Sequence, residues 1–295
     1  SADTVFGKND GNVEILYHKD RSSASNFNAN GFSKLTLRKN SFSRTNTDSL
    51  TDMRLLSMDY NGDGAQDLVV CDPGWVHQNS DQARRVPRGI IHIFFPAALL
   101  EPATAESGIY GRQYKSGNIE RASIASVTMT RNSGQFLGAA VAANDVNGDG
   151  HDDLMAFVDD LFFIVWGGPN ATVGDILLST NMDSTVGLGL TENLLSDNLK
   201  GITSAALGDT NGDGHPELLL GWADDNFDFV TGRVKLITFR LTGNASAGWN
   251  FELKGGFRAT DASPPVLFSD VNADGFDDVV FGVPGEKGYQ GNDLT

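Results

Sequence analysis

The segment Asp145-Val-Asn147-Gly-Asp149-Gly-His-Asp-Asp153 decides how this chain folds, because nearly the same nine-residue pattern occurs four times. Positions 1, 3 and 5 are Asp, Asn and Asp, position 6 is Gly, and position 9 is a carboxylate. We call the copies loop 1 (59–67), loop 2 (145–153), loop 3 (209–217) and loop 4 (270–278). Oxygen ligands with this spacing converge on one point only if the loop coils tightly, and the glycine permits the sharp turn.

Each loop brings three carboxylates together, so a hard cation is its natural occupant. Calcium accepts flexible sets of oxygen ligands, whereas magnesium requires a stricter octahedron. We therefore predict one Ca²⁺ ion in each of the four loops. The predicted side-chain ligands are Asp59, Asn61, Asp63 and Asp67; Asp145, Asn147, Asp149 and Asp153; Asp209, Asn211, Asp213 and Glu217; and Asp270, Asn272, Asp274 and Asp278. A polar surface turn without metal would explain one copy, but four matched copies argue against it.

The loops do not fit an EF-hand, which needs a bidentate glutamate at position 12 and a helix on each side. Position 12 is apolar in every copy: Val70, Ala156, Leu220 and Phe281. Short apolar runs follow the loops, as at 68–70, and precede them, as at 139–143, and both kinds are typical of buried strands. The sequence therefore predicts a strand, a calcium loop and a second strand in each repeat.

This unit resembles the FG-GAP repeat, also called the VCBS or integrin-α-like repeat, known from the β-propeller heads of integrin α chains. The second copy contains Phe136-Leu-Gly138 before its loop, and the fourth contains Phe281-Gly-Val-Pro284 after its loop, as the family pattern requires. The first copy departs from the pattern with Cys71-Asp-Pro73, and the third departs with Gly221-Trp-Ala223. The resemblance covers residues from about 50 to 285.

The resemblance implies an all-β fold: a β-propeller of four-stranded antiparallel blades, with a calcium-binding loop between strands 1 and 2 of each blade. It also implies that the backbone carbonyl at position 7 completes each calcium site. The residues at this position are Ala65, His151, His215 and Phe276, and their variety suits a backbone ligand. We therefore do not expect the two histidines to act as imidazole ligands or catalytic bases.

We expect residues 1–295 to form a single β-propeller domain or a propeller fragment. The calcium-loop repeats lie at about 50–75, 136–160, 201–223 and 264–285, and a four-stranded blade fits their spacing. Third strands are expected at 89–95, 161–166 and 233–239, and fourth strands at 122–130, 175–179 and 250–257. Near the N-terminus, 12–17 and 32–38 have the pattern of another third and fourth strand.

The number of blades stays open at this point. The C-terminal repeat supplies a first and second strand and the N-terminus a third and fourth, which together would close a ring of four blades. Val5-Phe6-Gly7, however, resembles the end of a second strand, like Val280-Phe281-Gly282. That duplication instead predicts part of a larger propeller, for example one of seven blades.

Composition excludes several classes of function. The net charge of −16 comes mostly from the loops: twelve of the 38 acidic residues are predicted ligands, which leaves 26 acids against 22 bases. We therefore expect no nucleic-acid partner, and no apolar stretch is long enough to insert in a membrane. The usual catalytic motifs are absent, so we do not expect an enzyme.

Two features favour an extracellular or cell-surface protein. Loops of this kind fill where calcium is millimolar, as it is outside cells. The sequons Asn170-Ala-Thr172 and Asn244-Ala-Ser246 suit a secreted glycoprotein. The single cysteine, Cys71, permits no internal disulfide.

The resulting function hypothesis is an adhesion or receptor head that binds a protein or glycan ligand at a cell surface. The resemblance implies that partners bind on the face opposite the calcium loops, where insertions and hot-spot side chains would lie. The candidate residues there are Trp75, His77, Arg84, Arg85, Trp222, Asp224 and Asp225. The alternatives are a carbohydrate-binding lectin, or an accessory propeller of a polysaccharide-active or lipid-active enzyme.

Overall fold

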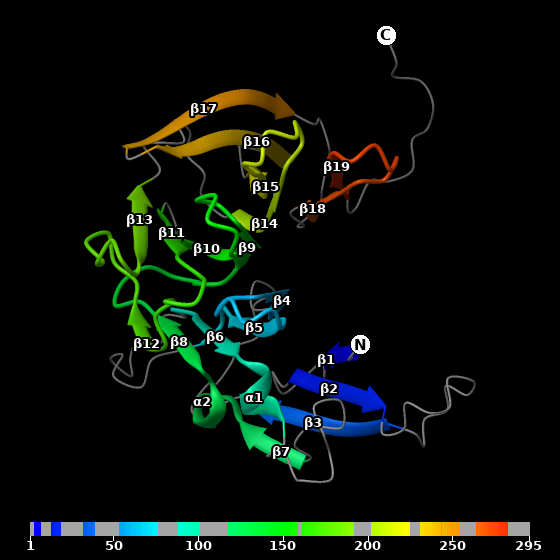
Figure 1. Ribbon diagram of the computed structural model, residues 1–295, viewed down its shortest axis with the longest axis vertical. Helices are drawn as coiled ribbons and strands as arrows, with labels where there is room; N and C mark the ends of the chain where they lie inside the picture. The colour runs from blue at the N-terminus through cyan, green and yellow to red at the C-terminus, as the bar shows by residue number, and fades with distance from the viewer. Residues whose placement is uncertain are drawn as a thin grey trace.

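Strands make up nearly all of the regular structure in this protein (Figure 1). The computed structural model describes residues 3–6, 13–18, 32–38, 53–75, 88–100, 117–158, 161–191, 202–224, 231–242, 244–253 and 264–282. Within these ranges the only helices are α1 (Pro96–Leu99) and α2 (Arg121–Ile124), and each has four residues. Neither has the length or hydropathy that crossing a membrane requires. The all-β prediction is confirmed.

The strands within the described ranges form five sheets, which we number in chain order. Sheet 1 contains β1 (Asp3–Phe6), β2 (Val13–His18), β3 (Phe32–Arg38) and β7 (Gly117–Glu120). Sheet 2 contains β4 (Arg54–Met58), β5 (Asp67–Asp72), β6 (Ile90–Phe94), β8 (Val127–Thr130) and β12 (Gly174–Leu177). Sheet 3 contains β9 (Ala140–Asn144), β10 (Asp153–Val158), β11 (Leu161–Val165) and β13 (Gly187–Thr191). Sheet 4 contains β14 (Ile202–Gly208), β15 (Glu217–Asp224), β16 (Thr231–Thr242) and β17 (Asn244–Leu253), and sheet 5 contains β18 (Val266–Ser269) and β19 (Asp278–Phe281).

Each numbered loop joins two antiparallel strands, as the sequence predicts. The residue before position 1 lies opposite position 9 in every repeat: Met58 faces Asp67, Asn144 faces Asp153, Gly208 faces Glu217 and Ser269 faces Asp278. Position 9 is therefore the first residue of the second strand. This register fixes the last predicted ligand to a sheet, while positions 1 to 8 form the connection.

The predicted third strands correspond to β6, β11 and β16, whereas two of the fourth-strand predictions need correction. The strand expected from residue 122 begins at Val127, because 121–124 form helix α2. Segment 175–179 is not the fourth strand of sheet 3; β12 instead pairs parallel with β8 at the edge of sheet 2. The fourth strand of sheet 3 is β13, whose Gly-Leu-Gly-Leu sequence lacks the β-branched residues that mark strands. The strand expected at 250–257 overlaps β17, and residues 254–257 lie outside the described part.

In sheet 1, β1 occupies the place of a second strand, next to the third and fourth strands β2 and β3. It pairs antiparallel with β2, and β2 pairs antiparallel with β3. In the part of the chain that the structure describes, β19 pairs only with β18. The arrangement in which β18 and β19 complete the N-terminal sheet is therefore not seen there. The described sheets do not form a closed ring of four blades.

Successive sheets pack face to face, and separate cores fill the junctions between sheets 1 and 2, sheets 2 and 3, and sheets 3 and 4. One cluster joins Val13, Ile15, Leu35 and Leu37 of sheet 1 to Val70 and Phe94 of sheet 2. In β10, Leu154 and Ala156 belong to the core shared with sheet 2, whereas Met155 and Phe157 belong to the core shared with sheet 4. Both faces of the strand are buried because successive side chains point to opposite faces of a sheet. The first strands also lie side by side, since β9 contacts β4 and β14, and β14 contacts β18 (Figure 1).

Candidate metal centres

One hydrogen-bond scaffold shapes all four loops. The carboxylate at position 1 accepts from the glycine N–H at position 6, with N···O distances of 2.7 Å for Gly64 and Asp59, 2.7 Å for Gly150 and Asp145, 2.9 Å for Gly214 and Asp209, and 2.9 Å for Gly275 and Asp270. The Asn side chain at position 3 accepts from the N–H of position 5, and the Asp at position 5 accepts from that of position 7. Side-chain oxygens of positions 1, 3 and 5 therefore turn toward the inside of the same tight coil in every copy.

The carboxylate at position 9 closes each loop from the sheet side. It accepts from the N–H of position 2, at 3.0 Å from Tyr60 to Asp67, 3.1 Å from Val146 to Asp153, 2.8 Å from Thr210 to Glu217 and 2.9 Å from Val271 to Asp278. Asp67, Asp153 and Glu217 are buried and Asp278 is half-buried, in contrast to the exposed predicted ligands at position 5. Loops 1 to 3 thus combine exposed and buried carboxylates.

Burial and mutual repulsion both act against charge at position 9 of loops 1 and 2. The pKa of Asp67 is raised to about 6, chiefly by burial, with the hydrogen bond from Tyr60 opposing the shift and the carboxylates of Asp63 and Asp59 contributing to it. Burial likewise raises the pKa of Asp153 to about 6, with Asp149 and Asp145 adding to the shift. A bound cation would reverse this effect, because it favours the ionised form of every carboxylate around it.

Loop 1 has one feature that favours a bound cation. In loop 1, Oδ1 of Asp67 has no hydrogen-bond partner although the residue is only 1% exposed. A buried carboxylate oxygen without a partner is costly unless a cation neutralises it. Within the described ranges no three His, Cys, Asp or Glu side chains are gathered into a metal cluster. The three carboxylates predicted for each loop therefore do not form such a group in the described residues, and the asparagine amide and a backbone carbonyl would have to complete each site.

Neighbouring loops are packed against one another through positions 4 and 7. A Cβ added to Gly62 of loop 1 would lie 3.0 Å from Nδ1 of His151, the position-7 residue of loop 2. A Cβ added to Gly212 of loop 3 would overlap the ring of Phe276 in loop 4. The side chains at position 7 of loops 2, 3 and 4 therefore lie against the preceding loop.

The sequence analysis missed a second set of contacts, made by position 8. The Asp59 N–H of loop 1 donates to Oδ2 of Asp152 at 3.2 Å, and the Asp209 N–H of loop 3 donates to Oδ2 of Asp277 at 3.0 Å. Position 8 is an acid only in loops 2 and 4, and this alternation was the available signal. This alternation can be interpreted only when loops 1 and 2, and loops 3 and 4, are known to be neighbours.

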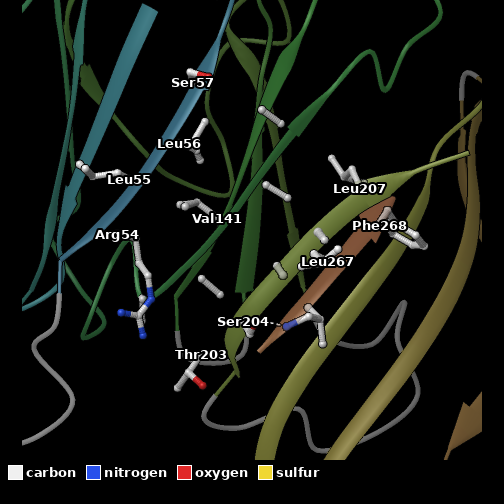
Figure 2. Close-up of a pocket in the computed structure, with 17 residues that line it drawn as sticks. Arg54, Leu55, Leu56, Ser57, Val141, Thr203, Ser204, Leu207, Leu267 and Phe268 are labelled. Carbon is white, nitrogen blue, oxygen red and sulfur yellow. Dashed lines mark hydrogen bonds between the residues drawn. The ribbon is translucent and has the colours of Figure 1, made fainter. Parts of the chain in front are cut away.

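The first strands of four sheets surround a cavity of about 390 Å³ (Figure 2). Its lining is mostly alanine, leucine and valine, with Arg54 and Thr203 toward one end and Ser57 elsewhere along β4. Each strand that lines it leads directly into a numbered loop. Disorder in one loop would therefore also disturb the strands that enclose the cavity.

Of the candidate partner residues, Trp75 is described in most detail. It is half-buried in the connection after β5, and its carbonyl accepts from the N–H groups of Arg88 and Gly89 at 2.8 and 3.1 Å. These bonds join the two ends of the long connection between β5 and β6. His77, Arg84 and Arg85 lie in that connection but outside the described residues.

The prediction for Trp222 needs correction. Trp222 is 4% exposed and packs in the core between sheets 3 and 4, so it stabilises the blade junction and does not form part of an exposed binding face. Asp224 ends β15 opposite Thr231, and Asp225 lies outside the described residues.

Comparison with known families agrees with the resemblance seen in the sequence. The family model of the FG-GAP repeat matches residues 266–292, which include β18, loop 4 and β19. No curated protein matches the chain. The chain therefore carries an FG-GAP repeat, an integrin-α-like unit typical of extracellular domains. Together with the packed antiparallel sheets, this repeat is consistent with a protein-binding β-propeller.

Proposed function

We propose that this chain is a calcium-stabilised, extracellular β-propeller module that binds a protein partner at a cell surface. The observation that carries the proposal is the hydrogen-bond scaffold common to four loops, together with the unpartnered buried oxygen of Asp67. Four copies of one geometry support one ligand chemistry, and clustered carboxylate and amide oxygens suit calcium.

In this proposal the role of calcium is structural. Positions 1, 3, 5 and 9 of each loop would hold one ion, with the backbone carbonyl of position 7. The ion would neutralise the carboxylates that repel one another around Asp67 and Asp153. Because the loops lead from first to second strands, filling them would stabilise the packing of neighbouring sheets.

Recognition would then take place at the opposite ends of the strands. In an antiparallel sheet the connection between strands 2 and 3 lies at the other end from that between strands 1 and 2. The connection between β5 and β6 therefore starts and ends away from loop 1. Trp75 lies near its start, and the same stretch of sequence contains His77, Arg84 and Arg85. Tryptophan and arginine are enriched among residues that dominate binding energy.

Calorimetric titration of the chelator-treated protein with CaCl₂ tests the calcium role directly. The wild type should bind calcium in all four loops and gain thermal stability, since a ligand specific to the native state stabilises it. Asp67→Asn should remove one binding event, and Gln66→Asn, an exposed neighbour in the same loop, should remove none. Absence of binding, with an unchanged melting curve in excess chelator, would reject the proposal.

The partner face needs its own experiment. Trp75, Arg84 and Arg85 changed together to alanine should abolish adhesion to cells that the wild type binds, while calcium stoichiometry is retained. The Gln66→Asn variant is the control on the calcium face. Normal adhesion by the triple variant would place recognition elsewhere, and saturable binding to simple sugars on a glycan array would favour the lectin alternative.

A further inference from the structure

We propose that Asp152 and Asp277 are positioning residues, each of which fixes the first calcium ligand of the preceding loop. The inference rests on the proposed calcium role and extends it: loops 1 and 2 form one coupled pair, and loops 3 and 4 form another. Within each pair the later loop supplies the carboxylate and the earlier loop supplies the backbone N–H.

The pair formed by loops 1 and 2 shows how the positioning works. The backbone N–H of Asp59 donates to Oδ2 of Asp152 at 3.2 Å. The side chain of Asp59 accepts from Asp63 and Gly64 of its own loop, at 3.0 and 2.7 Å. The next loop therefore holds the backbone of this ligand, while its own loop holds the carboxylate.

Loops 3 and 4 repeat the contact with an additional bond. The N–H of Asp209 donates to Oδ2 of Asp277 at 3.0 Å, and the N–H of Asp277 donates to the carbonyl of Asp209 at 3.0 Å. A Cβ added to Gly208 would lie 2.8 Å from the same Oδ2 atom, so the absence of a side chain at Gly208 admits the Asp277 carboxylate. Two hydrogen bonds therefore join loops 3 and 4, so we expect this pair to be the more rigid.

The junction between loops 2 and 3 is a natural exception. Position 8 of loop 3 is Pro216, whose side chain has no acceptor, and the N–H of Asp145 donates instead to Oδ1 of Asn144 at 2.8 Å. Asn144 is the residue directly before the loop, so loop 2 satisfies this donor locally. The same backbone donor is thus satisfied at all three junctions, but only two of them tie one loop to the next.

Holding a ligand in its bound position before the ion arrives lowers the entropy cost of binding. Removal of the Asp152 carboxylate should therefore weaken calcium binding at loop 1 about tenfold, as expected for loss of one charge-assisted hydrogen bond. The change should be much smaller at loop 2, because Asp152 occupies position 8 there and is not among its predicted ligands.

Two-dimensional amide NMR during a CaCl₂ titration can read the loops separately. Gly64, Gly150, Gly214 and Gly275 each donate to the position-1 carboxylate of their own loop, so each amide reports on one site. The variants are Asp152→Ala and Asp277→Ala. Asp152→Asn is the conservative variant, because it keeps an acceptor oxygen and removes the charge, and Gln66→Ala is the control at position 8 of loop 1.

We expect Asp152→Ala to shift the Gly64 titration about tenfold with little change at Gly150, and Asp277→Ala to shift Gly214 in the same way. Asp152→Asn should restore most of the Gly64 affinity, and Gln66→Ala should change none of the four titrations. Equal weakening of all loops, or failure of Asp152→Asn to restore affinity, would show a general structural or charge effect and overturn the inference. If the wild type binds no calcium, the proposed function fails, whereas amide exchange at Asp59, faster in Asp152→Ala, still tests the contact itself.

Discussion

Position 4 of the loops shows how a single residue sets local stability. Gly62, Gly148 and Gly212 occupy it in loops 1 to 3 with φ of 68°, 80° and 73°. Loop 4 has Ala273 at this position, with φ of 61°. The left-handed region costs an L-residue roughly 1–2 kcal/mol relative to the usual conformations, because Cβ approaches the following carbonyl oxygen. The fourth loop therefore contains strain that the other three avoid.

Ala273→Gly should raise the free energy of unfolding by about 0.5–1 kcal/mol. The change removes the left-handed strain, and the greater backbone freedom of glycine in the unfolded chain offsets part of the gain. Chemical denaturation of the calcium-saturated protein measures the difference.

The reverse substitution in loop 1 is the control. A Cβ at Gly62 would lie 2.8 Å from Cδ of Pro169 and would sit on a backbone with φ of 68°. Gly62→Ala should therefore destabilise the protein by more than about 1 kcal/mol. If Ala273→Gly also destabilises it, left-handed strain is not the dominant effect at position 4.

The residues of the loops were predictable because each position repeats with its own chemistry. Asp at position 1 and Gly at position 6 are bonded to each other in every copy. Asp152 and Asp277 were not predictable as contacts between loops, since their partners lie 93 and 68 residues away in the sequence. Trp222 was misassigned because a tryptophan after a short strand can either pack in the core or reach solvent, and only burial decides between them.

At the scale of elements, β12 joins one repeat to the sheet of another. It follows β11 of sheet 3 in the chain, yet it pairs parallel with β8 of sheet 2. Ile176 is the one buried residue of β12 and lies in the core between sheets 2 and 3, whereas Leu177 is about half exposed. The strand therefore ties two neighbouring sheets together on one face only.

Ile176→Ala should lower the free energy of unfolding by about 2–4 kcal/mol, because it leaves a cavity in a packed core. Leu177→Ala is the adjacent control and should cost less than about 1 kcal/mol, since this side chain is half exposed. Urea unfolding of both variants provides the measurement. Similar losses from the two substitutions would mean that β12 is held by its backbone alone.

Strands bounded by loops and rich in β-branched or aromatic residues were predictable as elements, as β6 and β11 show. The neighbours of a strand within its sheet were predictable only where a short turn joins the two strands. The parallel pairs β3 with β7 and β8 with β12 bring together segments that are distant in sequence. Local patterns of hydrophobicity do not encode such pairings.

At the scale of the whole molecule, charge is concentrated where the proposed metal sites lie. Apart from the twelve predicted carboxylate ligands the chain has 26 acids against 22 bases, so most of the net charge of −16 belongs to these ligands. Without calcium these groups repel one another across distances that salt can screen, because the Debye length is about 10 Å at 0.1 M ionic strength. The metal-free protein should thus be unusually sensitive to salt.

We expect the melting temperature of the metal-free protein to rise when NaCl is increased from about 20 mM to about 500 mM, since screening weakens the repulsion. The rise should be much smaller in saturating CaCl₂, where the ions neutralise the carboxylates. Differential scanning calorimetry in the two series measures both slopes. If the melting temperature of the metal-free protein did not change with salt, repulsion between the loop carboxylates would not be what destabilises it.

Asp149→Asn should change the melting temperature in opposite directions with and without calcium. The amide keeps an acceptor for the His151 N–H, which Oδ1 of Asp149 accepts at 3.0 Å, so the fold of loop 2 has its hydrogen bond in either case. Without calcium the variant loses one repulsive charge and should melt at a higher temperature than the wild type. With calcium it loses a charged ligand and should melt lower. Asp175→Asn, an exposed aspartate outside the loops, should show neither change. Only a role for Asp149 in holding a cation predicts this reversal, because a purely structural aspartate would shift both melting temperatures in the same direction.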